Sequence, residues 1–232
     1  MLVSAAVCPH PPLLVPELAA GAAAELDDLR SACAEAIGGL VASRPDLLVV
    51  VGQAPVVGPF PAAAWGSLRP YGVDIRVGTG PGPASLPLSL TIGRWLLDRS
   101  GVTVPWLLFG VPADAPPGRC ADLGAALADR APRVALLVMG DGTGRRVPKP
   151  GYLDERAEPY DDAVVEALRT VDREALLALD PALAVELLVA GRAAWQVLAG
   201  ATQGEGWVGD VTYAAAPYGV GYLVATWLRT TA

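Results

Sequence analysis

Histidine has the widest choice of chemistry of any side chain near neutral pH, and this chain of 232 residues contains a single one, His10. It lies in the stretch VCPHPPLLVPEL, directly after a short apolar run and among several prolines. An imidazole in such a position can bind a metal ion, transfer a proton, or pack and hydrogen-bond in a pocket. From the residues alone, all three roles stay open for His10.

Polar residues also follow two later apolar runs. Gln53 ends the run LLVVVGQ, and Asp141 follows VALLVMG in the stretch GDGTGRR. Successive glycine N–H groups can form a concave nest, and two arginines can grip a carboxylate or a phosphate. The glycines with Arg145 and Arg146 therefore predict an anion site. The alternative is that this segment is a flexible turn whose arginines are solvated. The spacing is not that of a P-loop.

The cysteines give little chemistry. Cys8, Cys33 and Cys120 are odd in number and have no CxxC spacing. This pattern indicates neither a disulfide framework nor a structural zinc site. We expect Cys8 and Cys33 to be small core residues.

Runs that suit strands alternate with stretches of helical periodicity along the whole chain. The predicted strands are 1–9, 45–52, 72–78 as an edge strand, 104–112, 133–142 and segments of 207–229. The predicted helices are 19–44, 89–101, 119–132, 160–180 and 181–204. No linker or repeat divides the chain. The pattern predicts one α/β domain over 1–232, with a mostly parallel or mixed central sheet flanked by helices.

The loops with polar residues are expected to meet. In parallel sheets, ligands gather beyond the carboxyl ends of the strands. The loops that contain His10, Gln53 and Asp141 each follow a predicted strand, so we expect them to lie side by side. With Arg145 and Arg146, these residues form the predicted ligand-binding site.

Charge and hydropathy exclude several classes of protein. The chain has 17 Lys and Arg against 24 Asp and Glu, so its net charge of −7 argues against binding to nucleic acid. The longest apolar runs are far shorter than a membrane span requires. The first residues lack the pattern of a secretory signal peptide, so we expect a cytoplasmic protein without a membrane partner.

Five segments, in order along the chain, resemble motifs of one enzyme superfamily. They are PHPPLLVPEL, RPDLLVVVGQAP, LLVMGDGTGRR, ALDPALAVELLVAGRAAWQVLAGA and APYGVGYLVA. They are similar to the PHPP segment, the strand into the SPH motif, the GDLSHR segment, the late helix and the GVGYLV strand of the class III extradiol ring-cleavage dioxygenases. This superfamily has the LigB-like fold and includes the Memo-type proteins. The resemblance covers most of the chain and implies the same fold.

The resemblance also implies an iron-dependent chemistry, and the catalytic positions of the family can be compared with the residues of this chain. Enzymes of this kind hold Fe(II) with two histidines and a carboxylate, and a further histidine acts as acid and base. His10 matches the first ligand histidine. The second ligand falls at Gln53 or Ala54, the acid/base residue at Gly144 and the ligand carboxylate at Val189.

Because one histidine cannot rebuild a two-histidine site, we expect no metal cofactor. The alternative is a substitute set of His10, Asp141 and Glu186 around Fe(II) or Zn(II), with Glu186 one helical turn before the matched position. We therefore expect a protein that has lost iron-dependent ring cleavage and serves in binding or scaffolding. The alternative is an enzyme acting on a small anionic or aromatic substrate in the same cleft, including a dioxygenase with the substitute ligands. The resemblance also implies a possible homo-oligomer.

Overall fold

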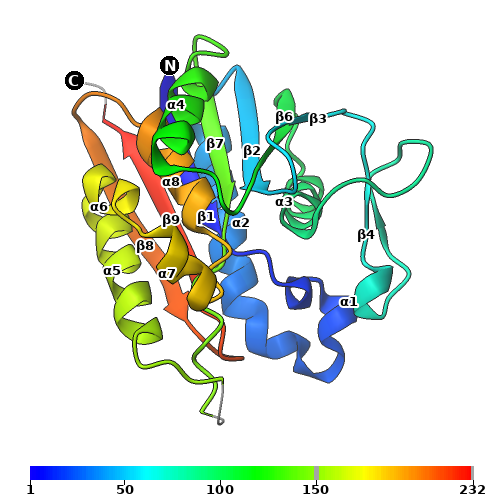
Figure 1. The fold of residues 1–232 in the computed structure, drawn as a ribbon. Coiled ribbons are helices and arrows are strands. Elements are labelled where there is room, and N and C mark those ends of the chain that lie inside the picture. The colour runs from blue at the N-terminus through cyan, green and yellow to red at the C-terminus, as the bar shows by residue number, and fades with distance from the viewer. Residues whose placement is uncertain (149–151, 231–232) are drawn as a thin grey trace.

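A computed structural model describes residues 1–148 and 152–230 of the chain. Within these residues one mixed sheet of 7 strands forms the centre of the molecule (Figure 1). In spatial order the strands are β3 (Gly58–Phe60), β6 (Trp106–Val111), β2 (Leu47–Gln53), β7 (Val134–Met139), β1 (Leu2–Cys8), β9 (Tyr222–Arg229) and β8 (Trp207–Ala215).

The direction of the strands divides the sheet into a parallel middle and antiparallel edges. Strands β6, β2, β7 and β1 are parallel to their neighbours in this group. Strand β3 is antiparallel to β6, and the hairpin of β9 and β8 is antiparallel on the β1 side. The predicted α/β fold with a mixed central sheet is thus confirmed.

Helices cover both faces of the sheet (Figure 1). They are α1 (Pro16–Ala19), α2 (Asp27–Ala42), α3 (Leu88–Arg99), α4 (Pro117–Ala128), α5 (Ala157–Thr170), α6 (Arg173–Leu177), α7 (Pro181–Glu186) and α8 (Arg192–Ala201). Helices α2 and α3 pack on one face, and α4, α5, α6 and α8 on the other. No helix among the described residues is long and apolar enough to cross a membrane.

Strand β2 shows why the apolar runs predicted a sheet buried on both faces. Val49 and Val51 join the core under α4 and α8, while Leu48 and Val50 join the core under α2 and α3. Side chains alternate between the faces of a strand, so a strand covered on both sides must be apolar at every position.

The predicted helix 19–44 is shorter than expected. Residues Ala20–Leu26 form a 3₁₀ helix, and α2 begins at Asp27. Before Leu26 this segment contains only Ala and Gly beside Glu25, so it has no large apolar side chain with which to pack a regular α-helix onto the sheet.

Two predicted long helices are each broken in the structure. The stretch 160–180 turns at Val171, which has a left-handed φ of 57°, and Asp172 then caps α6 by accepting from the Ala175 N–H at 2.9 Å. The stretch 181–204 is interrupted between α7 and α8 at Leu188, whose φ is 58°. In both cases, local backbone turns override a continuous helical pattern.

The predicted edge strand 72–78 is also wrong. Only Arg76–Val77 forms a strand, β5, and it pairs with β4 (Gly66–Ser67) in a separate small sheet. Gly72 and Gly78 bracket the segment with φ values of 102° and 99°, which turn the chain away from the central sheet.

Candidate ligand-binding site

The three loops singled out by their polar residues meet at the carboxyl ends of β1, β7 and β2. Met139 of β7 lies opposite Cys8 on one side and Gly52 on the other. The next residue continues this alignment, since the Gly140 N–H donates to the Cys8 carbonyl at 3.0 Å. The parallel topology therefore brings His10, Gln53 and Asp141 to one edge of the sheet, as predicted.

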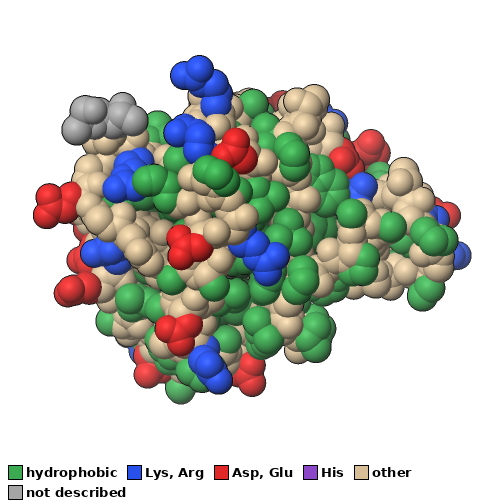
Figure 2. Space-filling view, turned by 90° about the horizontal axis from the view of Figure 1, so that it is seen from above, with side chains coloured by type: hydrophobic (Ala, Val, Ile, Leu, Met, Phe, Trp, Pro, Cys, Tyr) green, Lys and Arg blue, Asp and Glu red, His purple; other side chains and the backbone are tan. Residues whose placement is uncertain are grey.

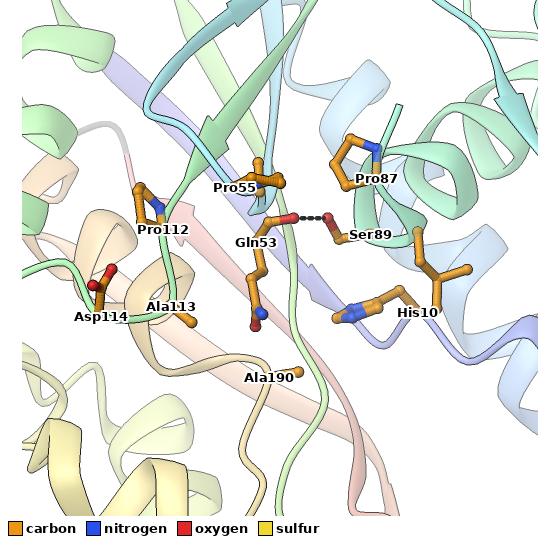
Figure 3. Close-up of a pocket in the computed structure, with 11 residues that line it drawn as sticks. His10, Gln53, Pro55, Pro87, Ser89, Pro112, Ala113, Asp114 and Ala190 are labelled. Atoms are coloured by element: carbon orange, nitrogen blue, oxygen red, sulfur yellow. Dashed lines mark hydrogen bonds between the residues drawn. The ribbon is translucent and has the colours of Figure 1, made fainter. Parts of the chain in front are cut away.

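A cavity of about 470 Å³ opens at this edge, and we call it the carboxyl-end cavity (Figure 3). Figure 3 shows the Gln53 side chain in the middle, pointing toward Ala190, with the His10 ring on one side and Ala113 and Asp114 on the other. The lining residues are His10, Gln53, Ala54, Pro55, Pro87, Leu88, Ser89, Pro112, Ala113, Asp114 and Ala190.

The lining is mostly apolar and carries no cationic residue. None of the described residues that line the cavity is Lys or Arg, and its ionisable side chains are His10 and Asp114. Prolines form much of the wall, and their rings cannot donate a hydrogen bond. The Ser89 hydroxyl donates to the Gln53 carbonyl at 2.6 Å and fixes the end of β2 against α3. The lining thus combines apolar surface with the polar groups of His10, Gln53, Ser89 and Asp114.

His10 lies in the cavity wall, and Asp141 lies beside it outside the lining. Asp141 Oδ1 accepts from the His10 backbone N–H at 2.7 Å and lies 3.7 Å from His10 Nδ1. His10 Nδ1 is buried and has no hydrogen-bond partner among the described residues. Burial raises the pKa of Asp141, and the neighbouring His10 opposes that rise. A proton on Nδ1 would face Asp141 and leave the lone pair on Nε2.

The break between α7 and α8 places Ala190 in the cavity wall. A side chain at Gly140 would meet the Gly191 Cα at 2.6 Å, so the start of α8 lies directly against the end of β7. A Cβ at Gly191 would instead meet the ring of Trp195, so both positions require glycine, each for its own contact. The predicted unbroken helix missed Ala190, and the one available signal was Gly191 within the helical pattern.

The loop after β6 was also missed, although it supplies Pro112, Ala113 and Asp114 to the cavity. Buried Arg192 at the start of α8 holds this loop by donating to the Ala113 carbonyl. Its guanidinium also donates to Gln196 Oε1 at 2.6 Å. The signal was available in the sequence, because β6 is a predicted parallel strand and its following loop reaches the same edge.

The predicted anion grip of Arg145 and Arg146 is not part of the cavity lining. Arg146 donates to Glu158 Oε1 at 2.6 Å and to Asp161 Oδ2 at 3.5 Å. Asp161 is buried and also accepts from Thr143, at 2.9 Å from the backbone N–H and 2.8 Å from the hydroxyl. Burial raises the pKa of Asp161. Arg146 thus serves the packing of the GDGTGRR loop.

Arg145 and Glu186 lie together at the end of α7, outside the cavity lining. Arg145 Nε donates to the Glu186 carbonyl at 3.3 Å. The Glu186 carboxylate is more than half exposed and pairs with Arg156 at 2.8 Å. Within residues 1–148 and 152–230, no group of three or more His, Cys, Asp and Glu side chains is placed to hold a metal ion. Glu186 is therefore not grouped with His10 and Asp141.

Cys8 points away from the cavity, into the core beneath α2. It is buried against Cys33, and a hydrogen bond from the Cys8 thiol to Cys33, together with burial, raises the pKa of the Cys8 thiol well above its usual value. Such a thiol stays protonated and unreactive. The interpretation of Cys8 and Cys33 as small core residues is confirmed.

Comparison with known proteins gives a fold but no function. No protein-family model matches the chain, and no curated protein matches it. Among solved structures the chain is similar to the uncharacterized protein JW3007 from Escherichia coli K12. The two share 16% sequence identity with a TM-score of 0.60, and the match covers 97% of this chain and 99% of that chain. At this identity the similarity establishes a shared α/β architecture alone.

Proposed function

We propose that this chain is a divergent relative of the class III extradiol dioxygenases that has lost iron-dependent ring cleavage. In this proposal the carboxyl-end cavity binds a small, uncharged aromatic ligand with hydroxyl groups. The observation that carries the proposal is the lining itself, in which His10 and Gln53 face an apolar hollow without any cation.

The positions of the matched residues support the family part of the proposal. His10 follows β1 and Gln53 ends β2, so the residues matched to the two ligand histidines line one cavity. The residue matched to the ligand carboxylate, Val189, immediately precedes Ala190 in the cavity wall. The acid/base position, Gly144, has no side chain, and its N–H donates to the Leu187 carbonyl at 2.9 Å.

The residues do not fit a mononuclear iron site of the two-histidine, one-carboxylate kind. The full sequence has one histidine, and the second ligand position is occupied by the neutral amide of Gln53 or the methyl group of Ala54. Carboxylate and imidazole donors must converge to hold Fe(II). The proposed function therefore involves no metal ion.

The ligand class follows from the charges around the cavity. Asp114 is the acidic residue of the lining, and a carboxylate there repels an anionic ligand. His10 and Gln53 can each donate and accept hydrogen bonds, which suits a phenolic hydroxyl. The apolar proline and alanine side chains of the lining suit an aromatic ring.

Titration of the purified chain with catechol and with benzoate tests this function by calorimetry. The two probes have similar size, and they differ in charge at neutral pH. We expect catechol to bind more tightly, and Asp114→Asn to improve binding of benzoate. Ala190→Phe fills the cavity and should abolish catechol binding, whereas Ala182→Phe on the exposed side of α7 should leave it unchanged. Tighter binding of benzoate by the unmodified chain would contradict the proposal.

A second candidate function is proton transfer from the bound phenol to His10. The placement of Asp141 on the Nδ1 side of the ring favours it, because a carboxylate there favours the tautomer that carries its proton on Nδ1 and its free lone pair on Nε2. The phenolic O–H bond breaks, and its proton moves to Nε2. The absorption of bound 4-nitrocatechol reports its ionisation. We expect the ionised spectrum at lower pH in the unmodified chain than in His10→Gln, and equal spectra would exclude this role.

A further inference from the structure

The opposite end of the sheet contains a second and larger hollow that the proposed function does not use. Its volume is about 990 Å³, and it lies where β1 and β7 begin and where α2 ends. We call it the amino-end cavity. Its polar side chains come from Ser43, Arg44, Arg133, Glu205, Arg229 and Thr230.

The three arginines of this cavity form no ion pair with a carboxylate among the described residues. Arg44 makes no side-chain hydrogen bond or ion pair within the described part of the chain. The Arg229 guanidinium makes one hydrogen bond among the described residues, to the Met1 sulfur at 3.5 Å. The guanidinium donors of Arg44 and most of those of Arg229 are therefore available.

Arg133 joins the two walls of the cavity. Its guanidinium donates to the Arg44 carbonyl at 2.9 Å and to the Ser43 carbonyl at 2.5 Å, where α2 ends. Its backbone N–H donates to Asp46 Oδ2 at 3.0 Å. These bonds leave its second terminal nitrogen free for a ligand, and they hold the guanidinium in place beside Arg44.

This concentration of positive charge runs against the charge of the whole chain. The net charge is −7, yet the lining of the amino-end cavity carries three arginines against one acidic side chain, Glu205. Figure 2 looks down onto this end of the molecule and shows several basic side chains on it, with acidic and apolar side chains around them. A local cluster of unpaired guanidinium groups attracts anions that the rest of the surface repels.

We propose that the amino-end cavity binds a small, multiply charged oxyanion of the phosphate class. Arginine donors match phosphate oxygens in pairs, and their charge-assisted hydrogen bonds are stronger than neutral ones. The volume is that of a ligand pocket for a molecule considerably larger than a single phosphate. The site is independent of the carboxyl-end cavity, because the two share no lining residue.

Calorimetric titration with inorganic pyrophosphate tests the proposal on the full chain. We expect Arg44→Gln and Arg229→Gln each to weaken binding by about tenfold or more, as for loss of a charged hydrogen bond. Arg44→Lys should retain part of the affinity. Arg99→Gln is the matched control, since Arg99 is exposed, stacks on Trp95 and lies outside the cavity. High salt should weaken binding by the unmodified chain.

Three results would overturn the assignment. Equal binding of pyrophosphate to Arg44→Gln, Arg229→Gln and Arg99→Gln would show an adventitious ion only. Pyrophosphate could fail to bind at low salt. Polyglutamate could bind in an Arg44-dependent way without any binding of pyrophosphate, which would identify an acidic protein segment as the occupant. Circular dichroism of each variant checks that its fold is intact.

Discussion

The two ends of the central sheet are built on opposite principles. At the carboxyl end, apolar walls surround His10 and Gln53, and the nearby carboxylates of Asp141 and Asp161 are held by hydrogen bonds from the chain. At the amino end, Arg44 and Arg229 face a larger hollow without a carboxylate partner among the described residues.

This difference separates two uses of charge. The buried charges at the carboxyl end stabilise loops, since each is satisfied by the protein itself and removing one leaves its partners unpaired. The arginines at the amino end pair with no carboxylate among the described residues, so we expect them to contribute little to folding and to be available to a ligand. A ligand without negative charge is therefore expected at the end where α/β folds usually bind ligands, and an anion at the other end.

The largest effect on stability is expected from Asp161→Ala. This substitution removes the acceptor of the Thr143 N–H, the Thr143 hydroxyl and Arg146, and leaves these donors unpaired. Urea denaturation should show a loss of about 3 kcal/mol in the free energy of unfolding. The exposed neighbour Asp162→Ala is the control and should change it by no more than about 0.5 kcal/mol, like Arg44→Gln at the amino end.

An equal loss of stability in Asp161→Ala and Arg44→Gln would remove the contrast between buried and exposed charges.

Binding of catechol and binding of pyrophosphate should be weakened by different substitutions. His10→Gln is expected to weaken catechol binding by about tenfold and to leave pyrophosphate binding unchanged. Arg229→Gln should do the reverse. Calorimetry measures both ligands on both variants, so the ligand whose binding should not change is the control for each variant. A variant that weakens binding of both ligands would show that the two ends are coupled.

The pH dependence of stability sharpens the account of Asp141. Burial raises the pKa of Asp141 in the folded chain above the ordinary value of 3.8 that applies to the unfolded chain. Between the unfolded and the folded pKa, the folded chain therefore binds more protons than the unfolded chain. Stability from this group therefore falls as the pH rises through that range. Asp141→Asn removes the fall, so its stability relative to the unmodified chain should increase from acid to neutral pH. A relative stability independent of pH in urea titrations would contradict it.

The smallest effect is expected from Glu186→Gln. Its carboxylate forms an exposed ion pair with Arg156, which is typically worth less than about 1 kcal/mol. Catechol binding, measured by calorimetry, and metal content, measured by elemental analysis, should be the same in Glu186→Gln as in the unmodified chain. A loss of bound metal in Glu186→Gln would restore the substitute ligand set of His10, Asp141 and Glu186.

The sheet could be predicted from the sequence because its signal is local. Every position of a strand such as β2 must be apolar when helices cover both faces. The unbroken apolar run LLVVV therefore predicts such a strand. The convergence of the loops with His10, Gln53 and Asp141 then follows from parallel topology alone.

The rest of the site depends on contacts between distant segments. Ala190 reaches the cavity because Leu188 adopts a left-handed turn and Gly191 packs against Gly140, and neither event is encoded in the helical periodicity around them. In the same way, Arg146 looked available for an anion because its partner Asp161 lies 15 positions further along, on α5. Pairing of side chains across loops is the information that composition and spacing lack.

The most direct test of the central claim is catechol binding by the chain after removal of metal with a chelator. The account predicts that affinity is unchanged by the chelator, is unchanged on addition of Fe(II), and is lost in Ala190→Phe. Binding that requires Fe(II), or a coloured ring-cleavage product on addition of Fe(II) and oxygen, would contradict it.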